Sequence, residues 1–376
     1  MTKRSEDKLK YFKGSLLAGA AGDALGYAVE FITYDGIISK YGEKGICAFD
    51  LKGGKAIISD DTQMTLFTAN GILFGDTRGK MRGIAAETHS YVYLAYLDWL
   101  STQGYVKPYD KTEISWLLKV PELFSSRAPG NTCLSALASG KVGTINEPLN
   151  TSKGCGSVMR IAPYGLFYGD LLKRSPQRFI NEAMAIGAIT HGNPFSHLTC
   201  ALASCVLAKV IYENYDSLEK AVVDSLPIVE KYTPFVQFGE FSSLIRSALE
   251  LTKNDRRDEE NIRDLGEGWV AEEALAIAIY CACKYENDLE KCLIAAVNHS
   301  GDSDSTGAIA GNLLGAFLGV DAIPEKFLKD LELKEVIEEI AADLSTGCPM
   351  SEYGSEFDYD WSEKYIKKRR PPKPLF

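Results

Sequence analysis

The chain of 376 residues lacks several signals that mark special classes of protein. Its nine cysteines form no CxxC pairs and are scattered, so neither a zinc site nor a disulfide framework is expected. The N-terminus is charged and has no apolar core of a signal peptide. No segment has the roughly 18 apolar residues that a membrane span requires; the best candidate, 308–320, is shorter and contains Asn312. Reduced, buried thiols in a cytoplasmic protein fit these absences best.

Excess positive charge is also missing. The formal net charge is −10, which argues against a nucleic-acid surface, because such surfaces need clustered lysines and arginines to neutralise phosphates. The basic cluster at 367–370, followed by Pro371 and Pro372, is interpreted as a solvated tail. An apolar content of 45% and a charged content of 24% are typical of a soluble globular protein that can bury a large core.

Long alternating runs typical of strands are absent, and the apolar pattern is helical instead. Apolar residues recur at three- and four-residue spacing in twelve segments, which predicts an all-α fold. The segments are 11–30, 61–74, 83–100, 131–139, 178–190, 196–213, 217–230, 242–252, 270–285, 289–297, 305–319 and 334–345. Intervening stretches with turn residues, including 127–132 and 253–269, are predicted to be loops. We predict a single compact multi-helix domain over 1–349 and a C-terminal extension over 350–376.

Two of the predicted helices carry small residues at every fourth position. One has Gly14, Ala18, Gly22 and Gly26, and the other has Gly307, Gly311, Gly315 and Gly319. Residues four apart lie on one face of a helix, where small side chains let a neighbouring backbone approach closely. Because each glycine inside a helix costs roughly 1 kcal/mol relative to alanine, tight packing must offset the loss. We predict that both helices are central and in close contact with their neighbours.

Two short acidic clusters each precede a helix-like stretch, Ser59-Asp60-Asp61-Thr62 and Gly301-Asp302-Ser303-Asp304-Ser305-Thr306. One interpretation is structural, with Ser59 as helix cap and the acids complementing the helix dipole. A cap needs only one such group, however, and each cluster offers several. If the fold brings the clusters together, they form an all-oxygen pocket suited to a hard cation such as Mg²⁺ or Mn²⁺. An EF-hand starting at Asp302 is excluded, because its twelfth position is Leu313 instead of glutamate.

Four further features have both a structural and a functional interpretation. The turn over 152–157 has backbone N–H groups suited to a phosphate, but it also fits a simple turn. His191 is the most suggestive of the four histidines because it lies at a helix end, but on its own it is interpreted as a structural hydrogen-bonder. Glu30 ends a predicted helix, and its structural interpretation is a solvated glutamate at the C-terminal end of that helix. Trp269 fits either an aromatic platform or a hydrophobic staple.

Six motifs in register along residues 11 to 320 resemble the ADP-ribosylglycohydrolase family, which comprises all-helical, metal-dependent enzymes such as ADP-ribosyl-arginine hydrolases and the activating glycohydrolase of dinitrogenase reductase. The motifs are Gly22-Asp23-Ala24-Leu25-Gly26 with Glu30, Ser59-Asp60-Asp61-Thr62, Gly154-Cys155-Gly156-Ser157-Val158-Met159-Arg160, Thr190-His191, Gly268-Trp269-Val270, and Gly301-Asp302-Ser303-Asp304-Ser305-Thr306-Gly307.

The resemblance implies a site with two Mg²⁺ ions, for which Mn²⁺ is a possible substitute. The implied metal ligands are Ser59, Asp60, Asp61, Asp302, Asp304 and Ser305. The implied substrate-binding residues are Ser152, Lys153, Gly154, Cys155 and Gly156 along the diphosphate, His191 near the ribose-phosphate end, and Glu30, which matches a metal ligand or gate in one branch of the family. Cys155 stands where some relatives have asparagine.

The resemblance also implies hydrolysis of the C1″ N- or O-glycosidic bond of ADP-ribose on a protein side chain or small acceptor. The ions would bind ribose hydroxyls and activate a water, and Asp60, Asp61 or Asp304 would be the catalytic base. The implied partner is an ADP-ribosylated protein or a small-molecule conjugate, bound by a monomer. Two alternatives remain: an ADP-ribose-binding or structural relative with little turnover, and a Mg²⁺-dependent nucleotide phosphohydrolase.

Overall fold

The computed structural model describes residues 3–83, 86–108, 113–354 and 357–366. Within these ranges the regular elements are all helical, which confirms the all-α prediction. The basic cluster at 367–370, with Pro371 and Pro372, lies outside the described residues, so its interpretation as a solvated tail stays a prediction.

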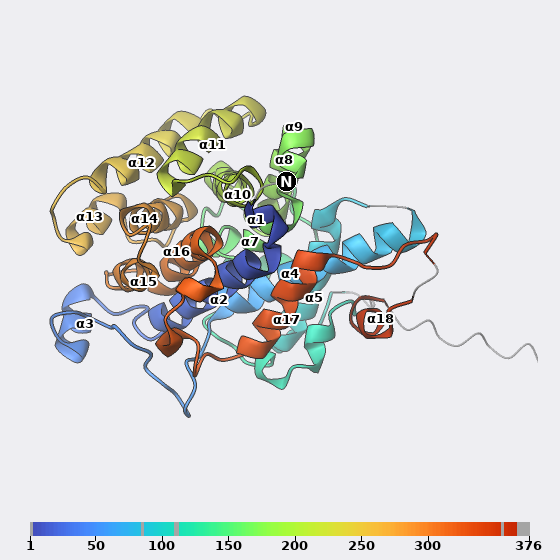
Figure 1. Cartoon of the computed structure of the whole chain (residues 1–376), viewed down its shortest axis with the longest axis horizontal. Coiled ribbons are helices and arrows are strands. Elements are labelled where there is room, and N and C mark those ends of the chain that lie inside the picture. Colours follow the sequence, from blue (N-terminus) through green and yellow to red (C-terminus); the bar gives the residue numbers. More distant parts are fainter. Residues whose placement is uncertain (1–2, 84–85, 109–112, 355–356, 367–376) are drawn as a thin grey trace, which may run out of the picture.

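The α-helices follow one another along the chain, and some connections, such as 42–59 and 139–161, are long (Figure 1). Their bounds are α1 (Lys3–Glu6), α2 (Lys8–Gly26), α3 (Tyr34–Tyr41), α4 (Asp60–Arg82), α5 (Thr88–Thr102), α6 (Asn131–Ala138), α7 (Ala162–Tyr168), α8 (Leu171–Arg174), α9 (Pro176–Ala188), α10 (Pro194–Ala208), α11 (Leu218–Tyr232), α12 (Phe238–Leu251), α13 (Asp258–Leu265), α14 (Ala271–Lys284), α15 (Leu289–Val297), α16 (Ser303–Leu318), α17 (Lys334–Thr346) and α18 (Tyr359–Tyr365).

Each of the twelve predicted helical segments overlaps an observed helix, and the pattern missed several short ones. The prediction of a loop over 253–269 was wrong, because α13 forms there. Asp258, Glu259 and Glu260 occupy its first turn, where acids complement the helix dipole. Its apolar pattern is weak, since only Asn261, Ile262 and Leu265 are buried. The C-terminal extension likewise contains α18.

One stretch corrects the expectation that no segment is apolar and long enough to cross a membrane. Among the described residues, Pro194–Glu213 passes that test by length and composition. It comprises α10 and the π-helical turn Lys209–Glu213 that continues it. The whole stretch is buried inside the protein, and buried core helices commonly pass the same test, so it is weak evidence for a membrane segment.

The centre of the molecule is the packing of α2 along α16, the most extensive contact between two helices in the described chain (Figure 1). A methyl group placed on Gly22 would lie 2.1 Å from the carbonyl oxygen of Gly307, and one on Gly14 would lie 2.3 Å from that of Gly315. At Gly311 it would lie 2.1 Å from the carbonyl oxygen of Ala18. The two backbones therefore touch along the glycine positions, which confirms the predicted close packing of both helices.

We expect the substitution Gly22→Ala to lower the free energy of unfolding by about 3 kcal/mol, because the added methyl group meets rigid backbone. The matched control is Gly239→Ala in α12, where the added group meets nothing within 4 Å. Since alanine favours helix, the control should be neutral or stabilising by up to about 1 kcal/mol. Urea unfolding of both variants checks this, and equal stabilities would contradict the account of the α2–α16 contact.

Candidate active site

A cavity of about 300 Å³ lies where α4 and α16 begin. Asp60 and Asp61 reach it from the first turn of α4, and Asp302, Asp304 and Ser305 reach it from the start of α16. The fold thus brings the two acidic clusters into one pocket, as the sequence analysis required of a metal site.

The start of α4 is held in place by Asp23 of α2, a residue that the sequence analysis included in a motif without giving it a role. The buried Asp23 carboxylate accepts hydrogen bonds from the backbone N–H of Ser59 (2.8 Å) and of Thr62 (3.0 Å), and from the Thr62 hydroxyl. It therefore binds amide groups that have no partner within the helix. The sequence signal for the capping role of Asp23 was the presence of a charged residue within the glycine- and alanine-rich helix α2.

Ser59 is the N-cap of α4, as predicted, and its hydroxyl accepts a hydrogen bond from the N–H of Asp61 at 3.2 Å. The residue is fully buried behind the cavity, whereas Asp60 and Asp61 line it. Its expected part as a metal ligand therefore stays a prediction, while its part in ordering the helix start is clear.

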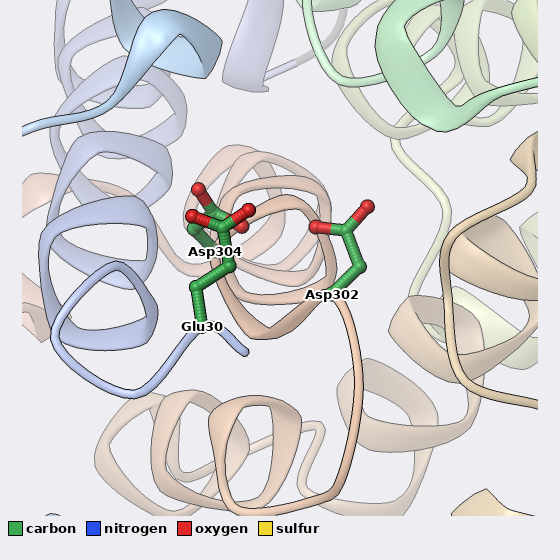
Figure 2. Close-up of side chains that lie close together, drawn as sticks. All are labelled: Glu30, Asp302 and Asp304. Atoms are coloured by element: carbon green, nitrogen blue, oxygen red, sulfur yellow. The ribbon is translucent and has the colours of Figure 1, made fainter. Parts of the chain in front are cut away.

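Three carboxyl groups converge most closely in the cavity. Figure 2 shows Glu30, from the segment after α2, pointing toward Asp302, the N-cap of α16, and Asp304 in its first turn. One oxygen from each group lies within 4.8 Å of the others. Asp302 and Asp304 are both 3% exposed, so water does little to screen their charges. The geometry therefore groups Glu30 with the expected metal ligands.

Burial and mutual repulsion disfavour ionisation of this cluster. Burial, followed by the charge of Asp304, raises the pKa of Glu30 to about 10 and that of Asp23 to about 7. The same two causes hold the pKa of Asp60 and of Asp61 well above the usual range. A divalent cation would remove the repulsion and let these carboxyl groups ionise.

The side chains that line the cavity fit a hard cation. Glu30 Oε2 and Asp61 Oδ2 are buried and have no hydrogen-bond partner among the described residues, and leaving such atoms unpaired is costly. With Asp302, Asp304 and the Ser305 hydroxyl they form a set of oxygen donors, the chemistry that Mg²⁺ and Mn²⁺ prefer.

The turn over 152–157, here called the glycine turn, also lines the cavity through Gly154, Cys155 and Gly156, together with His191. The turn is fastened to the segment before α14, because Cys155 N–H donates to the Trp269 carbonyl at 3.2 Å. A Cβ atom on Gly156 would lie 3.0 Å from the His191 ring, so glycine lets the ring lie against the turn. The Cys155 thiol donates to Asp302 Oδ2 at 2.8 Å and links the glycine turn to the start of α16.

Two of the expected substrate-binding residues are not among those that line the cavity. The Ser152 hydroxyl accepts a hydrogen bond from Gly154 N–H at 3.3 Å and so helps to shape the turn. Lys153 forms an ion pair with Glu272. The structure gives these side chains local partners, and their contacts with substrate stay predictions.

Two other parts of the lining, Phe31 and the segment 128–132, have no functional role predicted from the sequence. Phe31 stacks on Trp269 with ring centroids 5.3 Å apart. Phe31 is 70% exposed and has a φ of 64°, a strained backbone for a residue of this kind. This packing favours the platform interpretation of Trp269 over the staple. The segment 128–132 also lines the cavity; the predicted loop over 127–132 is wrong at its end, because α6 begins at Asn131. Its Gly130 N–H donates to Asp60 Oδ2 at 3.4 Å.

Comparison with known proteins identifies the family of this chain. The sequence matches the family model described as ADP-ribosylglycohydrolase over residues 4–353. This match spans most of the chain, and the chain belongs to the ADP-ribosylglycohydrolase family. A solved structure titled ADP-ribosylglycohydrolase-related protein complex has the same fold, with a TM-score of 0.61 and 21% identity, covering 90% of this chain and 98% of that one.

Curated relatives align over most of their length. The ADP-ribosyl-[dinitrogen reductase] glycohydrolase of Rhodospirillum rubrum is 26% identical, covering 85% of this chain and 90% of the relative. The ADP-ribosylarginine hydrolase Tri1 of Serratia proteamaculans is 27% identical, covering 92% and 82%. The uncharacterized protein YegU of Escherichia coli is 23% identical, covering 86% and 92%.

The pKa shifts predict how the stability of the metal-free protein depends on pH. A carboxyl group whose pKa rises on folding stabilises the protein below its unfolded pKa of about 4, and this stability is lost as the pH rises toward the folded value. For Glu30 that value is about 10. The buried histidines, whose pKa is lowered, act in the opposite direction but only below about pH 7. We therefore expect a lower melting temperature at about pH 8.5 than at about pH 7.

Bound Mg²⁺ or Mn²⁺ should counter this loss. At a free ion concentration 100-fold above its Kd, the stabilisation is about 2.7 kcal/mol, or a few degrees, and it should be larger at the higher pH. Thermal melts in EDTA and in Mg²⁺ measure both effects. The variant Asp302→Asn should show a smaller shift, while Asp321→Asn on the surface should match the wild type. Identical melts with and without the ion would contradict the metal site.

Proposed function

We propose that the protein is a metal-dependent hydrolase that cleaves the C1″ glycosidic bond of ADP-ribose attached to a protein side chain or small acceptor. The observation that carries the proposal is the meeting of both acidic clusters in one cavity with the glycine turn and His191. Family membership supports the same substrate class.

The chain's own groups have distinct parts in this proposal. Glu30, Asp302, Asp304 and Ser305, with Asp60 and Asp61, would hold two Mg²⁺ ions, or Mn²⁺ in their place, which supply an activated water when bound. We propose Asp61 as the base, with the carboxylate oxygen that does not hold an ion taking the proton; Asp60 and Asp304 are the other candidates. The N–H groups of the glycine turn would bind the diphosphate.

Arginine is the acceptor that the relatives favour. The two relatives whose names specify ADP-ribosylarginine, the Tri1 hydrolases of Serratia proteamaculans and Pseudomonas putida, each align with 92% of this chain. The ADP-ribosylhydrolase ARH3 of Homo sapiens aligns with 51% of it. We therefore propose a guanidinium nitrogen as the leaving group, with a serine hydroxyl as the second linkage to test.

We propose a cytoplasmic location and a monomer. All nine cysteines are free in the structure, and most are buried, as expected for a protein in a reducing compartment. The proposed partner is an ADP-ribosylated protein or a small conjugate. Of the alternatives, a binding protein without turnover is disfavoured by the complete acidic set, and a nucleotide phosphohydrolase would give AMP as its product.

The test is release of ADP-ribose from ADP-ribosylated arginine and serine peptides, with Mg²⁺ and with EDTA. We expect release that needs the metal, and a loss of about 10² to 10⁴ in kcat for Asp61→Asn, because the base is removed. The control Asp321→Asn, on the surface and paired with Lys10, should keep full activity. AMP as the product would support the phosphohydrolase, and ADP-ribose binding without turnover would support the binding protein.

A further inference from the structure

A buried arginine lies behind the cavity wall. The Arg160 side chain is 0% exposed, and the ring of Tyr96 faces its guanidinium at 4.3 Å. Its hydrogen bonds go to the Thr190 hydroxyl (2.6 Å) and to the sulfur atoms of Met64 (3.2 Å) and Cys133 (3.4 Å). Since sulfur is a weak acceptor, the bond to Thr190 is the strongest that this buried charge makes here.

The hydrogen atoms between Arg160, Thr190 and His191 are assigned from the donors and acceptors that these side chains offer. A guanidinium only donates, so the Thr190 oxygen accepts from Arg160. The hydroxyl keeps one hydrogen of its own, and Nδ1 of His191 lies 2.8 Å away. The Cys133 thiol is also within reach of this hydroxyl, but an imidazole nitrogen is the better acceptor. We therefore assign the hydroxyl hydrogen to Nδ1, which then carries the lone pair.

Electrostatics favour the same arrangement. Were Nδ1 protonated, its N–H would point toward the positive charge of Arg160. Burial, followed by the charge of Arg160, also lowers the pKa of His191 to about 3, so the doubly protonated ring is absent near neutral pH. The backbone is fixed as well, since Nε2 of His197 donates to the His191 carbonyl at 2.8 Å.

We propose that Arg160 and Thr190 are positioning residues that hold His191 as the neutral tautomer with hydrogen on Nε2. That nitrogen lies on the side of the glycine turn, 3.3 Å from where a Cβ atom of Gly154 would be, and the ring lines the cavity. His191 is thus a hydrogen-bond donor toward a ligand oxygen and does not act as a base. Only the identity of the ligand, ADP-ribose, rests on the proposed function.

Nitrogen NMR of the imidazole rings tests the tautomer directly. The chain has four histidines, so ¹⁵N-histidine labelling gives a simple spectrum, and the variant His191→Gln assigns the signal. We expect a pyridine-like Nδ1 and a pyrrole-like Nε2 at neutral pH in the wild type and in Thr190→Ser, which keeps the hydroxyl. In Thr190→Val, which keeps the shape and loses the hydroxyl, the Nδ1-protonated form should become populated.

Calorimetry with ADP-ribose and Mg²⁺ gives the second measurement. We expect Thr190→Val to bind about tenfold more weakly, because the donor is no longer fixed, and Thr190→Ser to bind nearly as the wild type. A pyrrole-like Nδ1 in the wild type would overturn the proposal, as would an unchanged tautomer in Thr190→Val. The wild-type spectrum shows which tautomer His191 adopts even where a variant fails to fold. Absence of ADP-ribose binding together with the expected tautomer would overturn the proposed function alone.

Discussion

The backbone contact between α2 and α16 is the constraint on which the site depends. It continues to the end of α2, where a Cβ atom on Gly26 would lie 2.3 Å from the Ser303 carbonyl oxygen and 2.6 Å from the Asp304 Cα. The chain leaves α2 at this point, so Glu30 lies beside the first turn of α16. The same helix carries Asp23, which orders the start of α4. Helix packing thus determines where the carboxyl groups meet.

The cost of gathering these carboxyl groups explains why the site is suited to a cation. Each buried acid gains a proton or a counter-ion, because an isolated carboxylate is expensive in a low-dielectric interior. The cysteine thiol and the amide groups at the helix starts satisfy some of the oxygens, while Glu30 Oε2 and Asp61 Oδ2 remain unpaired. The positive charge of the buried Arg160 contacts Thr190, which in turn contacts the His191 ring. The cavity is therefore lined by carboxyl groups suited to a cation and by His191, which we propose donates to an oxygen atom of a ligand.

The sequence predicted the helical class, the glycine contacts and most of the cavity lining. Helical periodicity and glycine spacing are local signals, and the acidic clusters stand at helix starts, where short motifs are easily recognised. The partnership of Glu30 with Asp302 and Asp304, the capping role of Asp23 and the stacking of Phe31 on Trp269 all depend on contacts between distant segments. Helix α13 was missed because charged residues dominate its sequence.

The most direct test of the central claim is a crystal structure of the protein grown with Mn²⁺, with anomalous diffraction used to locate the ions. The account predicts anomalous peaks in the cavity between the side chains of Asp60 and Asp61 and those of Asp302 and Asp304. Diffraction that shows these carboxyl groups bonded only to one another or to water, with no peak at saturating Mn²⁺, would contradict it.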